Sequence, residues 1–203
     1  MGVILINGVP GSGKTTIAYK LAAILEIEEV IQTDTIKEVF KVINHPEIAL
    51  STTHSAWKFF GEKNEQNIIN GFKAHTKYFE DFLLKIIEIT EKEGKNIIIE
   101  GVHATPRLYS LIETKNKISF FLNINESSRL VRCDVKNSKR KVKNTDWYNN
   151  SDVISFLNSY LLSQSMKNEV VIIYNNNIKY SLEFMIKCVK EKIITRGVSE
   201  YVI

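Results

Sequence analysis

The segment that most constrains this chain is residues 8–15, whose sequence GVPGSGKT matches the phosphate-binding pattern G-x-x-x-x-G-K-[ST] in full. A short apolar run, residues 3–7, precedes it, and apolar residues at helical spacing follow it. Glycines let successive backbone N–H groups point at phosphate oxygens, and the N-terminus of the next helix adds partial positive charge. The motif therefore predicts a strand, a phosphate-binding loop and a helix, in that order.

The same loop predicts the cofactors ATP and Mg²⁺. In this pattern Lys14 reaches the β- and γ-phosphates, and the Thr15 hydroxyl is a ligand of Mg²⁺. Asn175 follows the last apolar run, where we expect the adenine to bind. The residues expected to contact the nucleotide are Gly8, Pro10, Gly11, Ser12, Gly13, Lys14, Thr15, Thr16 and Asn175.

Five apolar runs alternate with helical patterns along the chain. They lie at residues 3–7, 30–33, 96–100, 118–124 and 170–174. Continuous Ile/Val runs between helices are typical of a parallel sheet that is covered on both faces. We expect one domain, residues 1–203, with the three-layer α/β fold of P-loop kinases. Its five-stranded parallel sheet should have the order 2-3-1-4-5, with helices on both faces. Residues 44–71 are interpreted as an insertion on the acceptor side.

Composition narrows the class of protein. Of 203 residues, 44% are hydrophobic and 25% charged, which is typical of a globular protein. No apolar run approaches the roughly 18 residues of a membrane-spanning helix, so no membrane partner is expected. The N-terminal residues lack the features of a signal peptide. Two cysteines imply no disulfide framework, and we expect a cytoplasmic protein.

Positive charge is concentrated in one segment. Residues 129–143 contain seven positive side chains and one negative one, so this segment carries +6 and the rest of the chain −2. Such a segment predicts a local anion site. We interpret residues 126–146 as a basic lid that closes over the transferred phosphoryl group. Arg129 and Arg132 lie three apart and are expected to stabilise charge in the transition state.

Two carboxylates follow the second and third apolar runs. Asp34 is expected beside the γ-phosphate, where it would bind the acceptor hydroxyl and take its proton, although it could also cap a helix. Glu100 is expected to hold Mg²⁺ together with Thr15, or to contact the acceptor. Neither the Asp-x-x-Gly nor the Asn-Lys-x-Asp pattern of GTPases occurs. The predicted catalytic residues are Lys14, Asp34, Glu100, Arg129 and Arg132.

Several local motifs resemble the 2-phosphoglycerate kinase family. Residues 98–103, IIEGVH, match its strand end, and residues 32–39, QTDTIKEV, look like its T-D-x-I-R-E-V turn. Weaker similarities lie at residues 51–57, 71–75, 129–132 and 159–162. The better-known members carry a further domain before the phosphate loop.

The resemblance implies ATP-dependent phosphorylation of 2-phosphoglycerate to 2,3-bisphosphoglycerate. It also implies that His103, in the IIEGVH motif, contacts the substrate. Arg107 and Trp57 are further candidates for the substrate pocket, beside Asp34. The expected partners are ATP and a small anionic metabolite, and the expected assembly is a monomer or homodimer.

Two other functions fit the same core. A nucleotide or polynucleotide 5′-kinase would act on a nucleoside or a 5′-hydroxyl oligonucleotide, so nucleic acid stays an alternative partner. A regulatory P-loop protein would bind ATP without phosphorylating a metabolite, and its basic segment would bind RNA or protein with marked salt dependence.

Overall fold

The structure, a computed structural model, describes residues 2–43 and 46–194. In these residues five strands form one parallel sheet of order β2-β3-β1-β4-β5, as predicted. The strands are β1 (Val3–Asn7), β2 (Glu29–Gln32), β3 (Ile97–Glu100), β4 (Lys117–Asn123) and β5 (Val171–Tyr174).

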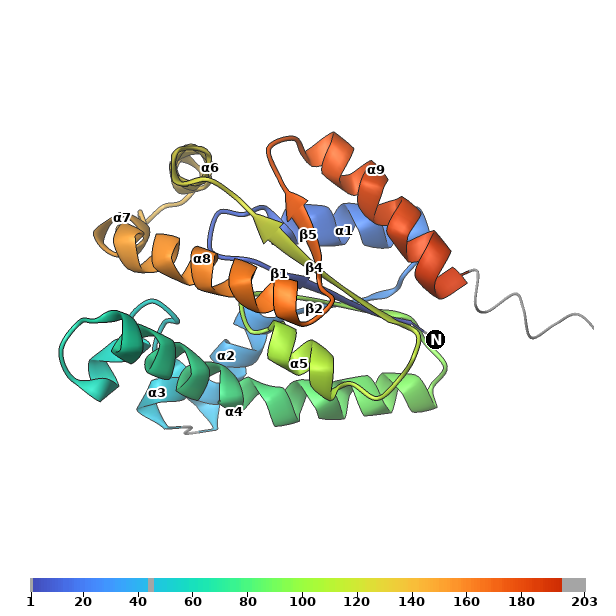
Figure 1. Cartoon of the computed structure of the whole chain (residues 1–203), viewed down its shortest axis with the longest axis horizontal. Helices are drawn as coiled ribbons and strands as arrows, with labels where there is room; N and C mark the ends of the chain where they lie inside the picture. Colours follow the sequence, from blue (N-terminus) through green and yellow to red (C-terminus); the bar gives the residue numbers. More distant parts are fainter. Residues whose placement is uncertain (1, 44–45, 195–203) are drawn as a thin grey trace, which may run out of the picture.

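Helices connect the strands and cover both faces of the sheet (Figure 1). They are α1 (Lys14–Leu25), α2 (Thr33–Val42), α3 (Glu47–Leu50), α4 (Glu65–Lys92), α5 (Pro106–Leu111), α6 (Glu126–Ser138), α7 (Asp146–Asn149), α8 (Ser151–Lys167) and α9 (Ile178–Val189). A 3₁₀-helix, η1 (Ala56–Phe60), precedes α4, and a π-helical turn, η2 (Lys190–Ile194), follows α9.

The alternation of side chains in β1 divides the core into two layers. Ile4 and Ile6 pack in a cluster with residues of α1 and α9, whereas Val3 and Leu5 pack with residues of α4, α5 and α8. Figure 1 shows α1 and α9 on one side of the sheet and α4 and α5 on the other. The three-layer α/β fold is thereby confirmed.

Strand register sets the position of the site. In the parallel ladders Ile6 and Gln32 are both register partners of Glu100. The three strands therefore end at nearly the same level, and the segments that follow them meet at one edge of the sheet. Open α/β sheets bind ligands at this carboxyl edge.

Element boundaries differ from the sequence-based expectation in two places. The second strand ends at Gln32, and α2 begins at Thr33, so Asp34 lies in the first turn of a helix. A carboxylate there is favoured by the helix dipole. The expected insertion, 44–71, also overlaps α4, which begins at Glu65 behind the capping side chain of Asn64. Long helix α4 thus anchors the end of this segment.

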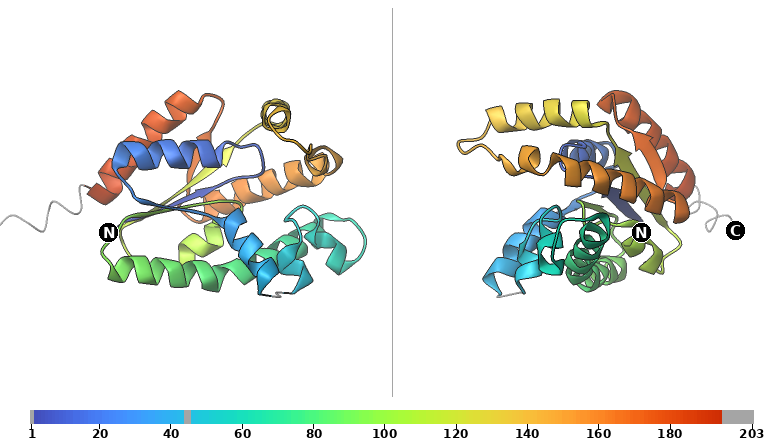
Figure 2. Two further views of the ribbon diagram at one scale, coloured as in Figure 1. Left: turned by 180° about the vertical axis from the view of Figure 1, so that it is seen from behind. Right: turned by 60° about the vertical axis from the view of Figure 1, so that its left-hand side comes forward.

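The basic segment lies at the same end of the molecule as the phosphate loop. It forms α6 and continues into α7. In the right-hand view of Figure 2, α6 and α7 lie on one side of this end, and α2 and α3 lie on the other.

Candidate active site

The phosphate loop connects β1 to α1 and needs its glycines. Gly8, Gly11 and Gly13 have φ values of 155°, 85° and 95°. A Cβ atom on Gly8 would lie 2.5 Å from Ser12 Oγ, and one on Gly13 would lie 2.8 Å from Asn175 Nδ2. Only glycine fits these positions, so the loop holds the compact shape that presents N–H groups to an anion.

Lys14 opens α1, and its ammonium lies inside the loop. Its Nζ donates a hydrogen bond of 3.1 Å to the carbonyl oxygen of Val9. Burial lowers the pKa of Lys14, while the nearby charges of Glu100 and Asp34 oppose this shift. A desolvated cation next to the loop favours binding of a phosphate, which would restore its charge balance.

Thr15 and Glu100 form the pair expected to hold Mg²⁺. Thr15 Oγ1 donates a hydrogen bond of 2.7 Å to Glu100 Oε1, and Glu100 is only 4% exposed at the end of β3. A hydroxyl and a carboxylate are hard oxygen ligands of the kind that Mg²⁺ prefers alongside phosphate oxygens and water. The two residues therefore fit the metal of a Mg·ATP complex.

A cavity of about 590 Å³ brings together much of the predicted site. Its lining combines the phosphate loop, both predicted carboxylates and the basic face of α6. It includes Pro10, Gly11, Gly13, Lys14, Thr15, Thr16, Asp34, Glu100, Arg132, Lys136, Lys139 and Trp147. Cations of the basic segment thus face the same cavity as the phosphate loop, together with Glu100 at the end of β3 and Asp34 in the first turn of α2.

Arg132 ties the basic segment to the phosphate loop. Its Nη1 donates a hydrogen bond of 3.0 Å to the carbonyl oxygen of Ser12, and its Nη2 donates to the carbonyl oxygen of Asn175. Nearby, Lys136 and Arg140 lie over the ring of Trp147, at 5.4 and 4.9 Å from its centre. Trp147 was not predicted, because its contacts depend on the packing of α7 under α6.

Arg129 lies deeper, against the loop. It is 1% exposed, and its Cγ would lie 3.0 Å from a Cβ atom on Gly11. Its Nη2 donates to Ser151 Oγ and lies 3.6 Å from a carboxylate oxygen of Glu126. Its Nε and Nη1 are buried without a hydrogen-bond partner. Because a guanidinium stays charged, these two groups favour an anionic ligand.

Three predicted substrate residues lie apart from this cavity. Both ring nitrogens of His103 contact protein atoms, and the residue is 2% exposed. Arg107 lines a separate groove between α4, α5 and α8, where its Nε donates to the carboxylate of Glu80 at 3.0 Å. Trp57 packs beside Gly71 of α4. Sequence position placed these residues near the sheet edge, but their side chains point elsewhere.

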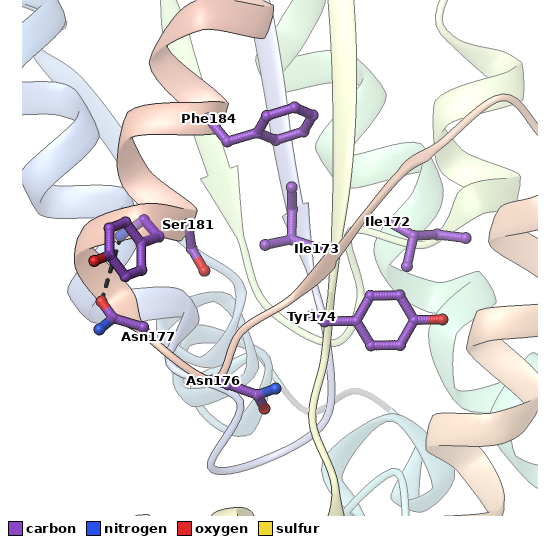
Figure 3. Close-up of a pocket in the computed structure, with 8 residues that line it drawn as sticks. Ile172, Ile173, Tyr174, Asn176, Asn177, Ser181 and Phe184 are labelled. Atoms are coloured by element: carbon purple, nitrogen blue, oxygen red, sulfur yellow. Dashed lines mark hydrogen bonds between the residues drawn. The ribbon is translucent and has the colours of Figure 1, made fainter.

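The side chain of Asn175 holds the phosphate loop through a hydrogen bond. It is fully buried, and its Nδ2 donates a hydrogen bond of 2.7 Å to the carbonyl oxygen of Ser12. The residues after it, Asn176 and Asn177, line a hollow of about 310 Å³ between β5 and α9. Figure 3 shows Ile173 and Phe184 in this hollow, which none of the phosphate-loop residues lines.

The fold and the phosphate loop define a P-loop nucleotide-binding protein, and comparisons with known proteins agree with this class. Residues 4–154 match the family described as an AAA domain, so the chain belongs to that family. Among solved structures, shikimate kinase from Acinetobacter baumannii in complex with shikimate has a TM-score of 0.56 and 15% identity. That match covers 95% of this chain and 96% of the shikimate kinase, and it shows a shared fold.

Curated relatives confirm the predicted resemblance to 2-phosphoglycerate kinases. The enzyme of that name from Methanocaldococcus jannaschii is 28% identical over 98% of this chain and 67% of its own length. The one from Pyrococcus furiosus is 32% identical over 95% of this chain and 65% of its own length. The chain thus spans about two thirds of the length of these relatives.

Two observations on the described part of the chain bear on cofactors and membranes. No three His, Cys, Asp or Glu side chains there are grouped so as to hold a metal ion by themselves. The Mg²⁺ pair described above would rely on phosphate oxygens for its other ligands. No described helix has both the length and the apolar character needed to cross a bilayer.

Proposed function

We propose that this protein transfers the γ-phosphoryl group of ATP to a hydroxyl group of a small anionic metabolite, and that this metabolite is 2-phosphoglycerate. The observation that carries the proposal is the single cavity in which Lys14, the Thr15–Glu100 pair and Asp34 meet. A nucleotide switch needs the first three groups, but it has less use for an exposed carboxylate on the acceptor side. The names of the curated relatives select 2-phosphoglycerate among possible acceptors.

Each group has a role in this reaction. The loop N–H groups and Lys14 bind the β- and γ-phosphates, and Thr15 and Glu100 hold Mg²⁺. When bound, Mg²⁺ neutralises charge on the phosphates. Asp34 orients the acceptor hydroxyl and accepts its proton as the oxygen–phosphorus bond forms and ADP leaves. Positioning and charge stabilisation dominate phosphoryl transfer, so proton removal contributes less.

The two arginines stabilise negative charge in the proposed reaction. Arg132 already contacts the loop through Ser12. Arg129 packs its Cγ against Gly11 and keeps two buried guanidinium nitrogens without a hydrogen-bond partner, so it adds positive charge beside the phosphate loop. Lys136 and Lys139 add positive charge at the cavity wall, which suits an acceptor that carries both a carboxylate and a phosphate.

We place the reaction in the cytoplasm, where ATP is available as the co-substrate. Cys133 and Cys188 are free thiols, which suits a reducing compartment. The proposal holds for a monomer or a homodimer, because every group named above comes from one chain.

An ATP-to-ADP coupled assay with Mg²⁺ and a panel of acceptors tests the proposal. The panel contains 2-phosphoglycerate, 3-phosphoglycerate, nucleosides and a 5′-hydroxyl RNA. We expect turnover with 2-phosphoglycerate that is lost in Asp34→Ala, whereas Asp81→Ala, an exposed change in α4, keeps it. Turnover with a nucleoside or RNA instead would establish the 5′-kinase alternative.

A further inference from the structure

Three hydrogen bonds in series cross the interior next to the proposed acceptor site. His75 Nδ1 lies 2.7 Å from the carbonyl oxygen of Ile48, and His75 Nε2 lies 2.9 Å from His103 Nε2. His103 Nδ1 lies 2.8 Å from Thr33 Oγ1. The two histidines are 1% and 2% exposed. The series joins α3, α4, the loop after β3 and the first residue of α2.

The chemistry of its ends fixes the direction of every bond. The carbonyl of Ile48 can only accept, so His75 carries its proton on Nδ1. A neutral His75 then accepts at Nε2, so His103 must donate from its own Nε2. A neutral His103 in turn accepts at Nδ1, and the Thr33 hydroxyl donates to it. The two histidines therefore have opposite tautomers.

The surroundings keep both rings neutral. Burial lowers the pKa of His75 to about 4; Lys37 and His54 also lower it, while the bond to Ile48 and the charge of Asp34 act in the opposite direction. Burial lowers the pKa of His103 well below its ordinary value, and His75, Lys37 and Lys14 add to this. The ring of Phe79, stacked at 3.7 Å between centres, covers His103.

The series ends beside both proposed catalytic carboxylates. Thr33 directly precedes Asp34, and Gly101 directly follows Glu100. A Cβ atom on Gly101 would lie only 1.8 Å from Thr33 Oγ1, so the Thr33 hydroxyl is held between this glycine and His103. The Thr33 hydroxyl thus connects the His103 ring to the first residue of α2, directly before Asp34.

We propose that His75 and His103 are positioning residues, which hold Asp34 relative to Glu100 and connect it to the segment around Ile48 through the Thr33 hydroxyl. This role rests on the proposed function, in which Asp34 orients the acceptor. It gives the histidine of the IIEGVH motif a role other than direct contact with substrate.

The first test reads the tautomers and needs no activity. Nitrogen-15 NMR of the histidine rings in the full chain should show His75 protonated at Nδ1 and His103 protonated at Nε2 at pH 7. His75→Gln and His103→Gln variants assign the signals. The same tautomer on both rings, or a positively charged ring at pH 7, would overturn the proposal. An inactive wild-type protein would instead defeat the proposed function, and the spectrum would still decide the state of this pair.

The second test separates positioning from folding. Thr33→Val keeps the shape of the side chain but removes its hydroxyl, and Thr33→Ser restores the hydroxyl. We expect Thr33→Val to lower kcat/KM for the acceptor about tenfold or more, because small displacements of reacting groups are costly. The KM for ATP should stay within about twofold, since the phosphate loop is untouched, and Thr33→Ser should recover most of the rate. Equal losses for acceptor and ATP, or a Thr33→Val enzyme with normal kinetics, would contradict the proposal.

Two variants at His103 test separately its contacts with Thr33 and with His75. His103→Asn can still accept from Thr33 through its amide oxygen but cannot reach His75, whereas His103→Gln reaches His75 and loses Thr33. If the pair acts through Thr33, the Asn variant keeps more acceptor kcat/KM than the Gln variant at equal melting temperature. A higher acceptor kcat/KM in the Gln variant than in the Asn variant would show that the histidines do not act through Thr33.

Discussion

Thr15 Oγ1 donates a 2.7 Å hydrogen bond to Glu100 Oε1, although 85 residues separate the two in the chain. Thr15 lies in the first turn of the helix after β1 and Glu100 ends β3, so parallel pairing of these strands creates the contact. The arrangement places a hydroxyl and a buried carboxylate next to the phosphate loop, where the proposed function places Mg²⁺ with ATP.

Replacing Glu100 by Gln should therefore affect the metal first. The amide keeps the size of the side chain but removes its negative charge. We expect the Mg²⁺ concentration for half-maximal rate to rise roughly 10- to 100-fold, as when partners of a metal site are changed. A titration of the rate with Mg²⁺ at saturating ATP measures this. An unchanged Mg²⁺ dependence would remove Glu100 from the metal site.

Lys14→Ala should abolish turnover while leaving the fold intact. The side chain donates within the loop and supplies the positive charge for the phosphates, so we expect kcat to fall about 100- to 1,000-fold. Lys20→Ala, an exposed change in the same helix, is the matched control and should be silent. Circular dichroism and the melting temperature check the fold. A Lys14→Ala enzyme with near-normal activity would refute the phosphate-loop assignment.

Stability should fall as the pH drops below about 6.5. His54 and His75 have pKa values lowered from 6.5 to about 4 by burial, so the unfolded chain binds more protons than the folded one between these values. The stability that the neutral rings provide is fully present above pH 6.5 and is lost toward pH 4, by roughly 3 kcal/mol for His75.

Urea unfolding at pH 7.0, 6.0 and 5.0 measures this loss. This range of pH isolates the histidines, because the exposed Glu88 carboxylate, whose pKa is lowered to about 2, affects stability only at more acidic pH. A free energy of unfolding that stays constant or rises from pH 7 to pH 5 would contradict the neutral, buried state of these histidines.

Gly71→Ala should destabilise the protein, although alanine normally favours a helix over glycine by about 1 kcal/mol. Gly71 lies in α4 under η1, and a Cβ atom would lie 2.4 Å from the backbone nitrogen of Trp57. The clash involves main chain, so we expect a loss of about 1–3 kcal/mol in the free energy of unfolding. Chemical denaturation checks this, and a stabilised variant would show that η1 does not pack on α4 this closely.

The features predicted from sequence are those that local patterns encode. The glycine spacing of residues 8–15 determines the loop, and continuous apolar runs determine a parallel sheet whose carboxyl edge brings Lys14, Asp34 and Glu100 to one cavity. The direction of long side chains depends on tertiary packing. For that reason, position alone did not show that Arg107 and Trp57 lie outside this cavity.

The hydrogen bonds that join His75, His103 and Thr33 could not be predicted from the sequence either. His75 and His103 are 28 residues apart, and Thr33 is 70 residues from His103. A lone histidine in a helix has no spacing that identifies its partner. The one available signal is the glycine of the IIEGVH motif, because Gly101 must leave room for the Thr33 hydroxyl.

Phosphorus-31 NMR of the full chain with Mg·ATP and 2-phosphoglycerate follows the proposed phosphoryl transfer itself. We expect ADP and 2,3-bisphosphoglycerate to form in equal amounts, with no product in the Asp34→Ala variant. Binding of ATP with 2-phosphoglycerate left unchanged, even at enzyme concentrations near those of the substrate, would contradict it.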